Sequence, residues 1–364
     1  MLKIDMLPAG YGDCLWIEYG SKSKPFRILI DGGISPTFET LRAKIETLSE
    51  SERHFELLII THVDADHIEG TIRLLGSVKT LGVSFGDIWF NGWKHLDAPD
   101  KLGGVQGEFL SALIDAGGHN WNKAFEGAAV VVPDEGDLPV FSFADGLTLT
   151  LLSPTRERLV KLKPKWNSEV QKAGLDRDSV EAVLAALEAN RKLRPEDDVL
   201  GEKTNNIEQL GNSRFSGDGA EANGSAIAIL AEYNGKSVLL TGDAWSPILA
   251  KSIQRILDKT GDDRLKVGAL KMPHHGSRAN ISTDLLDMLK CKKFLYSTNG
   301  KIFHHPDPEG VARVILHGGK SPSLFFNYRT EFTAVWDDST LMTSEHPYTV
   351  TYPADEAGGL EIEL

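Results

Sequence analysis

The sequence lacks several features that would place it at once in a large class of proteins. It has only 2 cysteines in 364 residues, too few for the disulfide framework of a small secreted domain. No apolar run approaches the roughly 20 residues that a membrane-spanning helix needs. No basic stretch followed by an apolar segment marks a signal peptide at the N-terminus. We therefore expect a cytoplasmic protein that does not enter a membrane.

Positive charge is also scarce. The chain has 39 lysines and arginines against 52 aspartates and glutamates, a formal net charge of −13. This argues against a broad DNA-binding face, because clustered lysine and arginine make the contacts with phosphates. An anionic substrate is still compatible with this charge, since bound divalent cations would make a site locally positive.

Three common catalytic signatures are missing as well. The sequence has no serine nucleophile elbow, no phosphate-binding Gly-Lys-Ser/Thr loop and no dinucleotide-binding Gly-x-Gly-x-x-Gly motif. With 41% hydrophobic and 25% charged residues, the composition is nevertheless that of an ordinary globular protein. A catalytic activity would therefore need another source of a nucleophile, and a metal-bound hydroxide is the one we expect.

The most informative stretch follows the apolar run 57–60, which predicts a buried strand. Four groups that can bind a metal lie within the next few residues, at His62, Asp64, Asp66 and His67. Imidazole nitrogens and carboxylate oxygens at one strand end suit Zn²⁺, Mn²⁺ or Fe²⁺. The alternative is a polar loop of turn residues and helix caps, which explains one or two of the four residues.

Two later strands also end in potential ligands. Asp243 follows an apolar strand at Thr-Gly-Asp and could extend its two oxygens to two ions, or else cap a helix at 247–259. His274 and His275 follow a strand at 268–272. Adjacent residues on an extended chain point in opposite directions, so we expect one of the two to ligate. We favour His274 as the ligand and assign His275 to substrate contact or proton transfer, with the reverse assignment open.

Residues 61–70 resemble the signature loop of the metallo-β-lactamase-fold hydrolases, in the branch where the second His of the common His-x-His-x-Asp-His is Asp. That branch includes the nuclease-like domain of bacterial DNA-uptake (competence) channel proteins and the phosphorylcholine esterases. Further segments resemble the motifs of this family in the expected order, at 10–14, 28–33, 237–243, 270–277 and 299–306. Together they span about residues 4–310.

The resemblance implies the fold class. It is α/β, a four-layer αββα metallo-β-lactamase sandwich with a helical insertion, in a single hydrolase domain over 1–364. Insertions are expected at about 92–128 and 155–222. The first reads as irregular, either a lid bordering the site or a surface loop pinned by its tryptophans. In the second, helices are expected at 156–169 and 178–192, and the polar segment 196–222 has the composition of a disordered region.

The resemblance also implies two divalent metal ions, Zn or Mn, and their ligands. Carried over by motif, the metal ligands are His62, Asp64, Asp66, His67, Asp243 and His274. One ion would be held by His62, Asp64 and Asp243. The other ion would be held by Asp66, His67, Asp243 and the His274/His275 pair. The catalytic set would be Asp66 as a base, His275, and His305, which precedes Pro306 and could contact a phosphoryl group or protonate a leaving group. The alternative for His305 is a loop histidine without a role.

One departure from the family is visible at Asn223, where these enzymes usually have another His. The first metal site would then be weaker, water-rich and better suited to Mn²⁺, unless His119 folds in as a substitute. Asp13 and Asp31 are expected to be structural, bonding the metal-loop backbone or the histidine ligands. Lys271 is expected to point away from the metals.

The leading function is a phosphodiesterase or nuclease acting on a small or single-stranded phosphodiester. The same fold supports a lactonase or β-lactamase-type carboxyl hydrolase, against which Asp64 in place of His argues. A third hypothesis is a metal-stabilised, non-enzymatic subunit of a larger bacterial system, with a protein partner docking on the helical insertion at 156–193.

Overall fold

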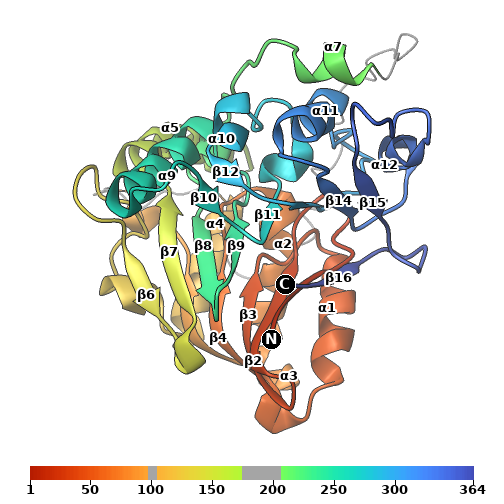
Figure 1. The fold of residues 1–364 in the computed structure, drawn as a ribbon. Helices are drawn as coiled ribbons and strands as arrows, with labels where there is room; N and C mark the ends of the chain where they lie inside the picture. Colours follow the sequence, from red (N-terminus) through yellow and green to blue (C-terminus); the bar gives the residue numbers. More distant parts are fainter. Residues whose placement is uncertain (97–104, 174–205) are drawn as a thin grey trace.

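A computed structural model describes residues 1–96, 105–173 and 206–364. One sheet has six strands in the order β16-β1-β2-β3-β4-β5. Their bounds are β1 (Leu2–Met6), β2 (Leu15–Ser21), β3 (Lys24–Ile30), β4 (His54–Ile59), β5 (Ser84–Trp89) and β16 (Leu360–Glu363). Strands β3, β4 and β5 are parallel, and the other pairs are antiparallel. The pairing of β16 with β1 brings both chain ends onto this sheet (Figure 1).

The second sheet has eight strands in the order β15-β14-β13-β11-β9-β8-β7-β6. Their bounds are β6 (Val140–Ser142), β7 (Thr148–Ser153), β8 (Ala228–Tyr233), β9 (Lys236–Leu240), β11 (Ala269–Lys271), β13 (Lys293–Tyr296), β14 (Ser323–Phe326) and β15 (Thr349–Thr351). The pairs from β9 to β15 are parallel. A short parallel pair, β10 (Leu265–Lys266) and β12 (Leu289–Lys290), lies apart from it.

Helices cover the outer faces of the two sheets. Their bounds are α1 (Thr37–Glu46), α2 (Ala65–Gly76), α3 (Val78–Leu81), α4 (Val105–Ala116), α5 (Arg156–Ala173), α7 (Ile207–Gly211), α8 (Glu221–Gly224), α9 (Ser246–Thr260), α10 (Thr283–Asp287), α11 (Pro308–His317) and α12 (Glu331–Ala334). Single 3₁₀ turns are η1 (Glu50–Glu52), η2 (Trp93–His95), η3 (Lys123–Phe125), η4 (Ala144–Gly146), η5 (Pro273–Gly276) and η6 (Val335–Asp337).

Three hydrophobic clusters define four layers. The middle one lies between the sheets and joins Ile17 of β2 to Leu240 of β9. One outer cluster packs α1, α2, α4 and α5 on the six-stranded sheet. The other packs α9, α10 and α11 on the eight-stranded sheet. The alternation of β1, with Leu2, Ile4 and Met6 buried between the sheets, shows how period-two patterning builds the middle layer. This αββα arrangement confirms the predicted fold class.

The segment 92–128 differs from the irregular insertion that the sequence predicted. It contains α4, whose Leu110 and Ile114 join the same outer cluster as α2, and both Trp93 and Trp121 are buried. The helical spacing of these apolar residues was hidden by the glycines on either side. The described part of this segment is therefore a piece of the helical layer.

The first helix predicted in the segment 155–222 is confirmed as α5, which extends four residues further than expected, to Ala173. The helix expected at 178–192 lies outside the described residues. The prediction of disorder for 196–222 is wrong for its described part, 206–222. There Gly211 of α7 lies against α11, and buried Arg313 donates to the Ser213 carbonyl at 3.1 Å. Buried polar groups are almost always hydrogen-bonded, and the hydrogen bonds that Arg313 donates to Ser213 hold this loop in a defined position.

Within the described ranges, no helix is both long enough and apolar enough to cross a membrane.

Candidate metal centre

The predicted metal loop connects the end of β4 to α2. Asp64 stands at the N-cap position of α2, and Asp66 and His67 fall in the first helical turn. His62 and His67 are buried, whereas the Asp64 side chain is 42% exposed and lies 3.6 Å from His62 Nε2 through its Oδ2 atom. The loop therefore turns three of its four candidate ligands inward and leaves Asp64 at the rim.

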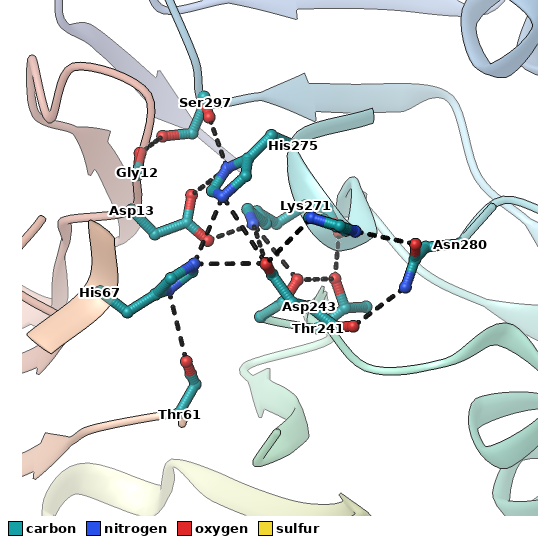
Figure 2. A network of polar contacts seen from close by, with 12 residues as sticks. Gly12, Asp13, Thr61, His67, Thr241, Asp243, Lys271, His275, Asn280 and Ser297 are labelled. Atoms are coloured by element: carbon teal, nitrogen blue, oxygen red, sulfur yellow. Dashed lines mark hydrogen bonds and ion pairs between the residues drawn. The ribbon is translucent and has the colours of Figure 1, made fainter. Parts of the chain in front are cut away.

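Asp243 lies at the centre of the cluster. Its Oδ1 atom is 3.4 Å from His67 Nε2, and its Oδ2 atom is 3.7 Å from both His62 Nε2 and His275 Nε2. Figure 2 shows His67 and His275 pointing toward this carboxylate. Gly242, with φ +49°, turns the chain at the end of β9, and a Cβ there would meet the Thr61 side chain. The strand end thus places Asp243 between donors from both halves of the chain.

His274 and His275 both face the cluster, contrary to the expectation that they point in opposite directions. They are not on an extended chain, because each has a left-handed backbone, with φ +46° and +54°. Such a conformation is uncommon for residues other than glycine and is concentrated at functional sites. His275 comes closer, with its Nε2 atom 3.2 Å from Asp66 Oδ2. His274 Nε2 is 3.8 Å from Asp243 Oδ2.

The hydrogen bonds made by Nδ1, on the side of each ring away from the cluster, also distinguish the two histidines. His275 is buried, and its Nδ1 donates to the Ser297 carbonyl at 2.8 Å, which leaves Nε2 facing the cluster. His274 is a quarter exposed, and its Nδ1 lies 2.9 Å from Asn280 Oδ1. Among the described residues, the groups whose donor atoms lie within 4.8 Å of one another include His275 but neither His274 nor Asp64. The geometry favours His275 as the ligand.

Several buried atoms of the cluster have no hydrogen-bond partner, among them His62 Nε2 and Asp243 Oδ1. Buried polar atoms are almost always bonded, and leaving one unsatisfied costs on the order of 1–3 kcal/mol. Mixed imidazole and carboxylate donors aimed at common points are the ligands that Zn²⁺ and Mn²⁺ take. The residues present therefore fit divalent metal ions.

The buried carboxylates and imidazoles of the cluster shift one another's pKa values. Burial would raise the pKa of Asp243, but His67 and His275 hold it well below its ordinary range. Burial would lower the pKa of His275, but Asp243 and Asp13 raise it to about 9. Nearby carboxylates, Asp243 first among them, also raise the pKa of His67 well above its ordinary range, so in the metal-free protein His67 and His275 carry the positive charge that the carboxylates require. Metal binding would release these protons.

Asp31, at the end of β3, orients one candidate ligand. Its Oδ2 accepts from His67 Nδ1 at 2.8 Å and from Thr61 Oγ1 at 2.7 Å, and its Oδ1 accepts from the Thr61 N–H at 2.8 Å. A carboxylate on the outer nitrogen fixes the tautomer of a ligating histidine and raises its basicity. Asp31 thus has the structural role expected from the sequence.

The turn at residues 10–13, which belongs to the first of the family-like motifs, packs directly on the metal loop. A Cβ on Gly12 would lie 1.7 Å from the Asp66 carbonyl oxygen, so only glycine allows this approach. The next residue, Asp13, is buried and forms an ion pair with Lys271.

The expectation that Lys271 points away from the metals is wrong. Its side chain is fully buried, and its Nζ atom lies 4.0 Å from Asp243 Oδ1. The flanking Leu270 and Met272 pack in the outer cluster. Strand alternation therefore turns Lys271 to the opposite face, toward the site. That alternation is the sequence signal that could have placed it.

Asn223 lies behind His274, with its Nδ2 atom 3.3 Å from His274 Nδ1 and donating to Asp218 Oδ2 at 2.7 Å. Asn280 Nδ2 donates to the same Asp218 oxygen at 3.1 Å. No sequence motif indicated that Asp218 or Asn280 would lie here. His119 does not lie in the cluster and so does not replace the missing ligand. Its ring packs on Phe85 at the start of β5, the opposite end of the parallel strands from the metal loop.

His305 lies at the rim of the cluster, its ring centroid 5.1 Å from that of His274. Its Nδ1 atom is 3.5 Å from Asp307 Oδ1. Phe303, two residues earlier, is 45% exposed and has its ring centroid 5.6 Å from that of Tyr11. The predicted His-Pro motif therefore does reach the site, together with aromatic neighbours that the sequence did not indicate.

No family model and no curated protein matches the chain. Solved structures similar to it include CmlA, a diiron β-hydroxylase from Streptomyces venezuelae, at 14% identity and a TM-score of 0.43, covering 100% of this chain and 54% of CmlA. Zn²⁺-bound PqqB from Methylobacterium extorquens matches at 13% identity and a TM-score of 0.41, over 100% of both chains. A metallo-β-lactamase from Cronobacter sakazakii matches at 12% identity and a TM-score of 0.29, over 70% of this chain and 73% of that one.

The chain thus spans about half the length of CmlA. At these identities and TM-scores the similarities carry no argument about activity, which has to come from the site. The assignment to the DNA-uptake and phosphorylcholine esterase branch stays a prediction.

Proposed function

We propose that the protein is a phosphodiesterase that works with two divalent metal ions, Zn or Mn. The observation that carries this proposal is the convergence of buried donors on Asp243, where His62 Nε2 and Asp243 Oδ1 have no hydrogen-bond partner. His62, Asp64 and Asp243 would hold one ion. Asp66, His67, His275 and Asp243 would hold the other. Two such ions lower the pKa of a bound water and neutralise charge that develops on a scissile phosphate.

The residues at the rim would act on the substrate. His274 is a quarter exposed and His305 is beside it, so both can reach a phosphoryl group above the cluster. His305 is within 3.5 Å of Asp307, a carboxylate that would orient its ring for donating a proton to a leaving group. Asp64, also at the rim, would be the most easily displaced of the proposed ligands.

The aromatic rim supports a small or single-stranded substrate with a flat organic group. Among the described residues, Phe303 is the exposed aromatic side chain, and its ring connects Tyr11 to His305. Stacking of a base on such a ring contributes about 1–3 kcal/mol. The net charge of −13 argues against a long duplex, which would need a broad basic face.

The test is hydrolysis of bis(p-nitrophenyl) phosphate by metal-stripped protein with Mn²⁺ or Zn²⁺ restored. We expect turnover that the Asp66→Ala and His305→Ala variants reduce at least about a hundredfold. A lactone and a β-lactam are the comparison substrates. Cleavage of these in preference to the phosphodiester would replace the proposal by carboxyl hydrolysis. Full phosphodiester turnover in Asp66→Ala would contradict it.

A further inference from the structure

Lys271 is a charged side chain that the proposed reaction does not use. It ends β11 and is fully buried. Its Nζ atom forms an ion pair with Asp13, donates to the Gly242 carbonyl at 3.3 Å and lies 4.0 Å from Asp243 Oδ1 (Figure 2). Burying an ammonium is costly unless it is paired and hydrogen-bonded. Its position beside the candidate metal ligands therefore calls for an explanation.

Asp13 has the location of a metal ligand. Its carboxylate belongs to two groups of donors within 4.8 Å of one another, one with Asp243 and His275 and one with Asp31 and His67. It is buried, and its Oδ1 atom is 3.5 Å from His275 Nδ1. Yet its other oxygen faces the Lys271 ammonium. The Lys271 ammonium thus occupies the position beside Asp13 in which a metal ion could otherwise be bound by this carboxylate.

We infer that Lys271 is a built-in cation that withholds Asp13 from the metal ligands and so sets how tightly the centre binds its ions. This rests on the metal centre of the proposed function and not on the reaction. The affinity of a site for a divalent cation rises with the number of negative ligands. A nearby positive charge opposes that cation directly, the more so in a buried site.

The inference predicts opposite effects for the two partners. Lys271→Met removes a positive charge and frees Asp13 as a ligand, so metal binding should tighten. Asp13→Asn keeps the shape of the side chain but leaves Lys271 to pair with Asp243, 4.0 Å away, so metal binding should weaken. A purely structural ion pair would instead make both variants less stable and shift metal binding in the same direction.

The measurement is the dissociation constant for Mn²⁺, from isothermal titration calorimetry on metal-stripped protein. We expect about tenfold tighter binding in Lys271→Met and about tenfold weaker binding in Asp13→Asn, with the double variant close to the wild type. Lys266→Met is the matched control, since Lys266 is exposed on β10. It should bind Mn²⁺ as the wild type does.

A Lys271→Met protein that does not fold leaves the comparison between Asp13→Asn and the double variant. Recovery of wild-type affinity in the double variant supports the inference, and affinity as weak as in Asp13→Asn overturns it. Weaker binding in both single variants also overturns it. Opposite shifts without phosphodiester cleavage would remove the proposed reaction and keep the role of Lys271. Wild-type protein that binds no Mn²⁺ would overturn both.

Discussion

The Nδ1 atom of His67 lies 2.8 Å from Asp31 Oδ2, and this contact turns Nε2 of the same ring toward Asp243. Asp31→Asn would remove the negative charge and preserve the shape. We expect metal affinity to fall roughly ten- to hundredfold, as measured by calorimetric titration with Zn²⁺ or Mn²⁺.

The control for this change is Asp87→Asn. Asp87 is also buried and accepts from Trp89 Nε1 at 3.0 Å, but it belongs to the β5 region and not to the candidate ligand groups. It should reduce thermal stability without changing metal affinity. Equal loss of affinity in both variants would mean that Asp31 acts only through folding.

The two adjacent histidines should behave differently. His275→Ala removes a buried donor that lies 3.2 Å from Asp66, so we expect the purified protein to lose one of its ions. His274→Ala removes a partly exposed ring 3.8 Å from Asp243, so we expect metal content to be kept and turnover to fall. Metal content by mass spectrometry beside the rate of phosphodiester cleavage separates the two. The reverse pattern would make His274 the ligand.

Phe303→Ala should raise the KM for a phosphodiester that carries an aromatic group by about tenfold, because stacking on one ring is lost. The KM for an alkyl phosphodiester should not change. The matched control is Val335→Ala, another exposed apolar side chain. Equal effects on both substrates would show that Phe303 supports the loop and not the substrate.

His95 predicts how stability depends on pH. It is buried, its Nδ1 accepts from the Gly92 N–H at 3.0 Å, and burial together with Lys94 lowers its pKa to about 4. Above the unfolded pKa of about 6.5 the ring is neutral in both states, so nothing is lost. As pH falls from there toward 4, the unfolded chain takes up a proton that the folded protein excludes, and stability drops by on the order of 3 kcal/mol.

The check is urea denaturation of wild type and His95→Asn between pH 7 and pH 4. The variant should lose less stability over this range, because its amide does not titrate and its Oδ1 can take the place of Nδ1. His54→Asn, at an exposed position on β4, serves as the control. An unchanged pH profile in His95→Asn would show that other groups produce the acid sensitivity.

Most of the candidate site could be predicted from the sequence, because an apolar run followed by polar residues indicates where a buried strand ends. An apolar strand followed by His62, Asp66 and His67, and another followed by Asp243, must deliver these residues to sheet edges. The sequence could not orient His274 and His275, because their left-handed backbones have no signature in residue type.

Contacts between distant segments were also beyond the sequence. The pairing of Lys271 with Asp13 depends on how the two sheets stack, and the contacts of Asp218 depend on the loop that precedes α8. The helix α4 was missed for a local reason, since flanking glycines concealed its apolar spacing. The fold class was predicted from motifs that resemble those of a known family and follow in the expected order, which the order of predicted strands and helices matched.

Asp243 would be a ligand of both metal ions in the proposed centre. The most direct test of this role is the metal content of purified wild type and Asp243→Ala by mass spectrometry, with circular dichroism to show that both are folded. We expect about two ions per chain in the wild type and loss of most of this metal in the variant. A folded Asp243→Ala protein that keeps the full metal content would contradict it.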